Sequence, residues 1–182
     1  ITNAVTFSNT GYIKFGDASG DSSTFNGGLT TTAPSGIRLA GTLQTSDDAM
    51  SLGDANTAIV LYANSVLNTV SAALTVNAAV NGGYTLTLNY SAATTFAGII
   101  GGSTKPTGIT TNSGGTVVFN TTAISTNGAQ AYGENATISG NITFTTTNND
   151  ITFSGTVNSV SDTKTLTIVA GSGDTTFSGT VG

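Results

Sequence analysis

The side chains of this sequence that could do chemistry are carboxylates, hydroxyls, amides and a few cations. Histidine and cysteine are both absent. Because a Ser-His-Asp triad, a Cys-His pair and a histidine or thiolate metal site each need one of them, those sites are excluded. The densest acidic group is Asp47, Asp48 and Asp54, and the next is Asp17 with Asp21. Paired carboxylates such as these therefore remain the possible basis for catalysis or metal binding.

The acidic residues admit three interpretations. Polysaccharide lyases with a β-helix fold use Asp-bound calcium beside Lys or Arg, and Arg38 near Asp47 and Asp48 is the only comparable arrangement. Calcium binding without catalysis is the second, although the Gly-Gly-Xaa-Gly-Xaa-Asp nonapeptide of calcium β-rolls is missing. The third is solvated turns, the ordinary role of Asp beside Gly and Ser. We favour the third, and we predict no enzyme, no catalytic residue, no metal site and no cofactor.

Asparagine and tyrosine are the side chains that could interact with sugars. Glycosylation sequons begin at Asn89, Asn120, Asn135 and Asn141, but chance explains them in a chain so rich in Asn and Thr. Exposed tyrosines could stack on sugars, whereas packing in the core is their commoner fate. The tyrosines are Tyr12, Tyr62, Tyr84, Tyr90 and Tyr132.

Charge is sparse and negative. Only 7% of the 182 residues are charged, against about a quarter in an ordinary domain, and the net charge is −5. The cations are Lys14, Arg38, Lys105 and Lys164. Because four scattered cations form no basic patch, we expect no nucleic-acid partner and no binding to an anionic membrane. No apolar run approaches the ~20 residues of a membrane-spanning helix.

The elements that must position these residues are short strands. No stretch shows sustained 3.6-residue periodicity, so we expect an almost helix-free chain. All eight phenylalanines end a short strand-like triplet, and six of them follow Thr. Because alternate residues of a strand point to opposite faces, this pattern predicts Thr outward and Phe inward.

A repeat connects these strands. The heptapeptide at 151–157 recurs almost unchanged at 175–181, which places Phe153 and Phe177 24 residues apart. Related copies contain Phe25 and Phe96, and their spacings suggest coils of this length or slightly longer. Residues 74–101 also align by eye with 151–182, with Phe96 on Phe177. The repeat predicts an all-β, right-handed parallel β-helix of about seven coils, with an antiparallel β-sandwich as the alternative.

We expect residues 1–182 to be a single β-helix segment of a longer or polymerised protein. The chain starts without Met or a signal peptide, and its last residues, 177–182, show no cap. Since an uncapped end exposes unpaired strand edges, this end should stack on another coil, from a longer chain or from another copy. Residues 101–115 are expected to be a loop, and residues 128–134 a polar link.

The C-terminal third resembles a known family. The motifs Gly128-Ala129-Gln130-Ala131-Tyr132, Ala136-Thr137-Ile138, Leu166-Thr167-Ile168 and the two copies of the heptapeptide look like repeats of bacterial surface exoproteins of the filamentous haemagglutinin type. Residues 74–101 fit the same pattern more loosely. The resemblance implies a right-handed parallel β-helix that is secreted and displayed at the cell surface, often as an adhesin shaft. From these observations we expect an extracellular structural or adhesive module, with a glycan-binding module and a polysaccharide-degrading enzyme as the alternatives.

Overall fold

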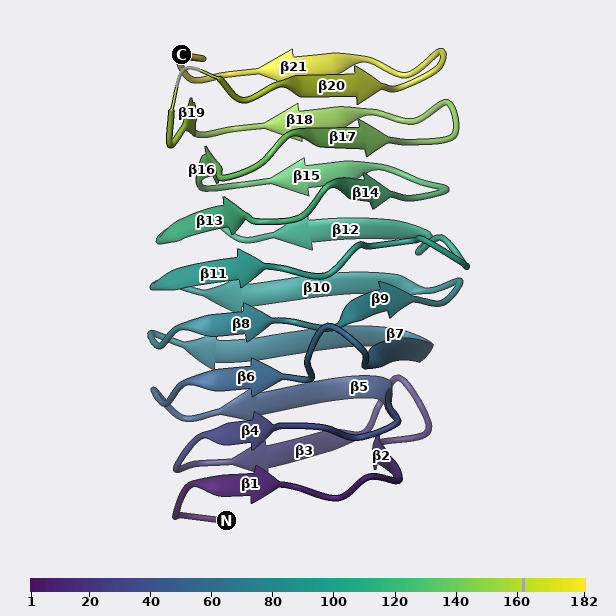
Figure 1. Ribbon diagram of the computed structural model, residues 1–182, viewed down its shortest axis with the longest axis vertical. Helices are drawn as coiled ribbons and strands as arrows, with labels where there is room; N and C mark the ends of the chain where they lie inside the picture. The colour runs from purple at the N-terminus through teal and green to yellow at the C-terminus, as the bar shows by residue number, and fades with distance from the viewer. Residues whose placement is uncertain (162) are drawn as a thin grey trace.

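The computed structural model describes residues 1–161 and 163–182 as a stack of parallel strands (Figure 1). These residues contain no helix, and every pair of neighbouring strands in them is parallel. The chain winds upward as a right-handed parallel β-helix, as predicted. The antiparallel β-sandwich is contradicted, because it requires antiparallel pairs.

The first face of the β-helix is an eight-stranded sheet with one strand from each coil. Its strands are β1 (Val5–Phe7), β4 (Leu29–Thr31), β6 (Met50–Leu52), β8 (Leu74–Val76), β11 (Ala93–Phe96), β13 (Thr116–Phe119), β16 (Asn135–Ile138) and β19 (Val157–Ser159). Eight strands mean eight coils, close to the seven that the sequence predicts.

Two further sheets supply the other faces. The ten-stranded sheet contains β2 (Tyr12–Phe15), β5 (Gly36–Thr45), β7 (Ala58–Val70), β10 (Thr85–Tyr90), β12 (Gly108–Thr111), β15 (Gln130–Tyr132), β18 (Ile151–Phe153) and β21 (Thr175–Phe177), with β3 (Ser22–Phe25) and β9 (Ala79–Asn81) at its sides. The three-stranded sheet contains β14 (Ala123–Ser125), β17 (Ile142–Thr145) and β20 (Leu166–Val169).

The long strands β5 and β7 turn a corner and belong to two faces. Their first halves pair with β2 and β9, and their second halves pair with β3 and β10. Bridges from Val80 to Ile100 and from Ile100 to Ile124 continue the line from β9 to β14. The second face is therefore defined as the following series: β3, the second half of β5, the second half of β7, β10, β12, β15, β18 and β21. The third face is β2, β5 and β7 (first halves), β9, β14, β17 and β20.

Inward side chains stack in columns along the axis. On the second face the ring of Phe177 stacks on that of Phe153 in the preceding coil, with ring centroids 5.2 Å apart and planes 6° from parallel. On the first face Phe96 and Phe119 stack in the same way at 6.1 Å. The third face carries an aliphatic column of Ile13, Ile37, Ile59, Val80, Ile100 and Ile124. The predicted ladder of inward rings is confirmed, because no coil can bury these side chains without its neighbours.

The expected phase of the repeat is wrong outside the last two coils. Phe96 lies in the first face, whereas Phe25, Phe153 and Phe177 lie in the ten-stranded sheet. The alignment of 74–101 with 151–182 fails for the same reason, since it equates strands of different faces. Coil length also varies more than predicted: Val5 pairs with Leu29, which is the expected interval, but Val117 pairs with Ala136, which makes that coil shorter. The Thr-Phe-Xaa-Gly motif marks the end of a strand at a corner, and it occurs on both the first and the second face.

Two segments that were expected to be irregular contain strands. The predicted loop 101–115 includes β12, which pairs with β10 and β15. The predicted polar link 128–134 includes β15, and its polar residues Gln130 and Glu134 are buried. Composition misled the prediction at both places, because the Gly, Ser and Asn residues around each short strand hid its β-favouring residues, Ile109 to Thr111 in β12 and Tyr132 in β15.

Gly115, at the corner before β13, should not tolerate a side chain. Its φ is +75°, and a Cβ atom there would collide with the Ala92 carbonyl oxygen, which accepts a hydrogen bond from Thr116 N at 3.1 Å. We expect Gly115→Ala to lower the free energy of unfolding by more than about 1 kcal/mol. Urea unfolding followed by circular dichroism measures this effect. Gly140→Ala is the matched control, because Gly140 has open space around it; equal losses in both variants would contradict the account.

Candidate functional site

The acidic cluster of the sequence is divided between two corners. Asp47 lies in the turn between β5 and β6, where its carboxylate accepts a hydrogen bond from Ser71 Oγ at 2.7 Å. Asp54 lies in the next turn and accepts bonds from Asn56 N and Thr57 Oγ1, both at 2.9 Å. The Thr57 bond, followed by the Asn56 bond, lowers the pKa of Asp54. These contacts are those of capped turns.

Arg38 does not join Asp47 or Asp48. Arg38 lies on the third face in β5. It forms no ion pair with either aspartate, because the only ion pair among the described residues joins Lys14 to Asp17 at 3.1 Å. The lyase-like arrangement, in which Arg38 stands beside the two aspartates, is therefore not assembled.

The second acidic group is also a turn. The Asp21 carboxylate accepts hydrogen bonds from Asp17 N at 2.7 Å and Ala18 N at 3.0 Å, and these bonds lower its pKa. In residues 1–161 and 163–182 no three acidic side chains gather in a way that could hold a metal ion.

Several asparagines, including two of the sequon residues, connect neighbouring coils. Asn135 Oδ1 accepts a hydrogen bond from Thr156 N at 2.9 Å, and Asn141 Oδ1 accepts one from Thr165 N at 3.0 Å. Each donor lies about one coil further along the chain. Asn89 and Asn120, the other two sequon residues, are exposed and make no such bond in the described part of the chain. The abundance of Asn thus has a structural cause at the corners.

A buried carboxyl group lies where the sequence suggested only a polar link. Glu134 is 3% exposed; its Oε2 accepts a hydrogen bond from Thr111 Oγ1 at 2.6 Å, and its Oε1 contacts the hydroxyl of Tyr90. Burial raises the pKa of Glu134. Burial, and then the carboxylate of Glu134, raises the pKa of both Tyr90 and Tyr132. No described cation pairs with Glu134, so the cluster is an internal polar contact that neutral hydroxyls satisfy.

The tyrosines divide into two groups. Tyr90 and Tyr132 are in the core, the fate that sequence statistics favoured. Tyr12, Tyr62 and Tyr84 are exposed, with 62% of Tyr12 and 48% of Tyr62 accessible to solvent. The guanidinium carbon of Arg38 lies 4.7 Å from the ring centre of Tyr12 and 5.2 Å from that of Tyr62. We call these three residues the Tyr–Arg–Tyr stack; it is the candidate site on the side of the β-helix.

Sequence reasoning singled out each member of the stack but did not bring them together. Tyr12, Arg38 and Tyr62 come from β2, β5 and β7, which are neighbours on the third face. Their proximity depends on coil register, and the variable coil length hides that register in the sequence. A signal did exist, since each lies within three residues of an Ile that belongs to the third-face column, Ile13, Ile37 or Ile59.

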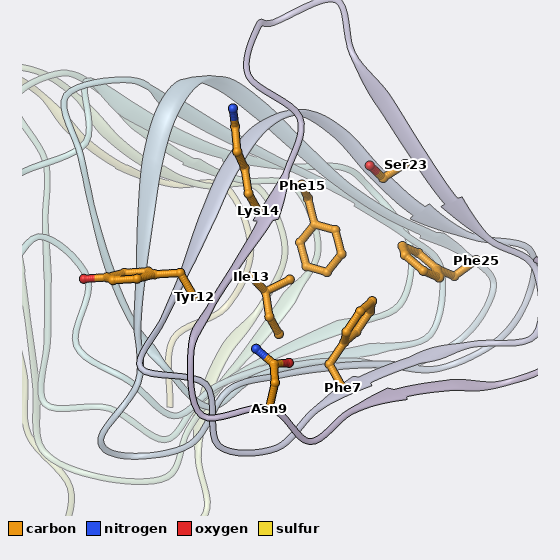
Figure 2. Close-up of a pocket in the computed structure, with 8 residues that line it drawn as sticks. All are labelled: Phe7, Asn9, Tyr12, Ile13, Lys14, Phe15, Ser23 and Phe25. Atoms are coloured by element: carbon orange, nitrogen blue, oxygen red, sulfur yellow. The ribbon is translucent and has the colours of Figure 1, made fainter.

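Both ends of the β-helix present apolar side chains. At the N-terminal end a cavity of about 510 Å³ opens between β1, β2 and β3. Figure 2 shows the rings of Phe7, Phe15 and Phe25 turned toward one another there, while Tyr12 and Lys14 extend away from them. At the other end Phe177 is 37% and Val181 55% exposed. Phe15 and Phe25 are already buried, so a further coil would bury mainly Phe7 at the N-terminal end, and Phe177 with Val181 at the other.

Comparison with protein-family models, with curated proteins and with solved structures finds no match. The described residues contain no helix with the length and apolar character needed to cross a membrane. The fold and the geometry of its surfaces are therefore the basis for any functional assignment.

Proposed function

We propose that this chain is a structural or adhesive β-helix module of a secreted bacterial surface protein of the filamentous haemagglutinin type, and that it stacks end to end. The observation that supports the proposal is the continuous column structure with an apolar surface at each end. Columns of stacked rings stabilise a rod, and a rod that lengthens by adding coils suits a shaft or fibre.

The proposed partner is a further coil at either end, supplied by a longer chain or by another copy. The edge strands β1 and β21 offer backbone groups to a parallel strand, and Phe177 offers a ring that the next coil would cover. The chemistry expected of such a shaft is packing rather than catalysis, so we propose no enzymatic activity. With four cations in the whole sequence, we also propose neither nucleic acid nor a membrane interior as a partner.

Self-association of the 182-residue chain tests the end-to-end contact. We expect sedimentation velocity to show species that grow with concentration, and electron microscopy to show rods that lengthen with it. Phe177→Asp should abolish this growth, because a charge on the stacking surface would be buried without a partner. Ile99→Asp is the matched control, since Ile99 is 42% exposed but lies away from both ends. A parent chain that stays monomeric and folded at high concentration would contradict the proposal.

A second candidate function, a glycan-binding module, has a specific observation in its favour. Three tyrosines are exposed on the outside of the β-helix, Tyr12, Tyr62 and Tyr84, where core packing does not explain them. A glycan array separates the two candidates, because a purely structural shaft retains no glycan. The third candidate, a polysaccharide-degrading enzyme, predicts activity that Asp47→Asn with Asp48→Asn removes; a parent without activity eliminates it.

A further inference from the structure

The Tyr–Arg–Tyr stack holds a cation on the outside of the β-helix without an anionic partner. The Arg38 side chain makes no hydrogen bond or ion pair with any described residue, and its Nε atom is buried without an acceptor. A guanidinium group carries five N–H donors and accepts nothing. The rings stack on the flat sides of the group and Nε is buried, which leaves the two Nη atoms; their N–H groups can bind a carboxylate in two parallel hydrogen bonds.

The backbone is irregular where it forms the stack. Leu39 pairs with Leu61 and Gly41 with Ser65, so Ala40 alone lies opposite Tyr62, Ala63 and Asn64. This irregularity is the corner between the third and second faces. Tyr62 lies just before it and points outward by the alternation that turns Ile59 and Leu61 inward.

A glycine accommodates the other ring. Gly36 is the register partner of Tyr12, and a Cβ atom on Gly36 would lie 2.6 Å from Tyr12 Cε1. Any side chain at position 36 would therefore displace the Tyr12 ring from its place beside Arg38. The glycine on β5 thus makes room for the Tyr12 ring, and regular alternation in β7 places Tyr62.

The charges around the stack are not those of a purely structural contact. Lys14 is the direct cross-strand partner of Arg38, and like charges in that position are destabilising. Asp17 neutralises Lys14, at 3.1 Å, but no described carboxylate reaches Arg38. Two of the four cations of a chain with a net charge of −5 are thus neighbours here, and one of them is free to bind an anion.

We propose that the Tyr–Arg–Tyr stack binds a carboxylated sugar, that is, a uronic acid residue of an acidic oligosaccharide. The Arg38 guanidinium would bind the sugar carboxylate, and the rings of Tyr12 and Tyr62 would pack against the apolar faces of adjoining sugar residues while their hydroxyls bond sugar hydroxyls. The inference rests on the glycan-binding candidate above and adds to it the site and the class of sugar. It is independent of end-to-end stacking, because the stack lies on the side of the rod.

Two oligosaccharides that differ only at C6 test the proposal: a β-1,4-linked hexamer of glucuronic acid and cellohexaose, the matching hexamer of glucose. Isothermal titration of the 182-residue chain should give a Kd for the glucuronate hexamer about tenfold or more below that for the glucose hexamer. Arg38→Gln and Arg38→Lys should each raise the Kd for the glucuronate hexamer about tenfold, since Lys lacks the planar fork. Tyr62→Ala should weaken the binding of both hexamers.

Lys105→Gln is the control for net charge, because it removes one positive charge elsewhere, and it should change the Kd less than about twofold. Thermal melting of each variant establishes that it folds. Equal effects of Arg38→Gln and Lys105→Gln on the Kd for the glucuronate hexamer would overturn the proposal. A glucose hexamer sulfated at C6 carries the charge without the carboxylate, and a Kd for it equal to that for the glucuronate hexamer would also overturn the proposal. If both uncharged and charged hexamers bind and Arg38→Gln changes neither, the glycan-binding candidate stands and this site is wrong. If no hexamer binds, both are wrong.

Discussion

Truncation of Phe119 to alanine is expected to lower the free energy of unfolding by about 3–5 kcal/mol. Phe119 is fully buried on the first face, and its ring meets those of Phe96, Tyr132 and Phe144, with the last two at 5.1 and 5.0 Å. Removal of this ring leaves a cavity at the point where aromatic side chains of all three faces meet. Because the coils on both sides are held in register by backbone hydrogen bonds, the cavity cannot collapse.

Phe177→Ala provides the matched comparison for Phe119→Ala. The Phe177 ring has one aromatic contact, with Phe153, and is 37% exposed. We expect this variant to lose less than about 2 kcal/mol. Urea unfolding of both variants, followed by circular dichroism, gives the difference. Equal losses would show that Phe119 is not at the centre of a stacked core.

Replacement of Glu134 by glutamine is expected to stabilise the protein above neutral pH by about 1–3 kcal/mol. Burial raises the pKa of Glu134 above its ordinary value of 4.5. A group whose pKa is higher in the folded state contributes full stability below its unfolded pKa and loses it as the pH rises through the folded pKa. The parent should therefore become less stable from about pH 4.5 upward, whereas Glu134→Gln should not.

Urea unfolding at intervals from pH 4 to pH 8 measures this dependence. The titratable groups in contact with the carboxyl of Glu134 are Tyr90 and, close by, Tyr132, and burial keeps both neutral throughout this range by raising the pKa of each. Asp174→Asn is the control for the loss of one carboxylate, because Asp174 is exposed at the corner before β21. A Glu134→Gln profile parallel to that of the parent would show that the buried carboxyl has an unperturbed pKa.

The sequence predicted the strands and their stacking well, because both follow from local alternation. Phe153 and Phe177 are 24 residues apart and each ends a triplet in Thr-Phe, so their stacking was correctly predicted. The phase of the earlier coils was not correctly predicted, because the corners that connect the faces differ in length. Short corners, for example, make the coil from Val117 to Ala136 shorter than 24 residues. Side-chain alternation tells which residues point inward, but it does not tell which of three faces they point from.

The candidate site was less predictable than the fold. Arg38 was considered with Asp47 and Asp48 because they are close in sequence, whereas its contacts come from coils on both sides, at Tyr12 and Tyr62. The corner that follows Tyr62 holds two extra residues opposite Ala40, and no composition rule marks such a change of register. Glu134 was missed for a related reason, since its hydroxyl partners on Tyr90 and Thr111 lie in earlier coils, two and one before it.

The central claim, that Phe153 and Phe177 belong to successive coils of one column, is tested most directly by an engineered disulfide. Thr152 and Thr176 are outward-facing register partners in β18 and β21, about 4.8 Å apart as neighbouring strands are, and the parent has no cysteine. The account predicts that Thr152→Cys with Thr176→Cys forms an intramolecular disulfide on mild oxidation, detected as loss of free thiols by mass spectrometry. Thr152→Cys with Thr167→Cys, on different faces, should keep both thiols free. Free thiols in the Thr152→Cys, Thr176→Cys variant under these conditions would contradict the stacked coils and would favour an arrangement of two opposed sheets.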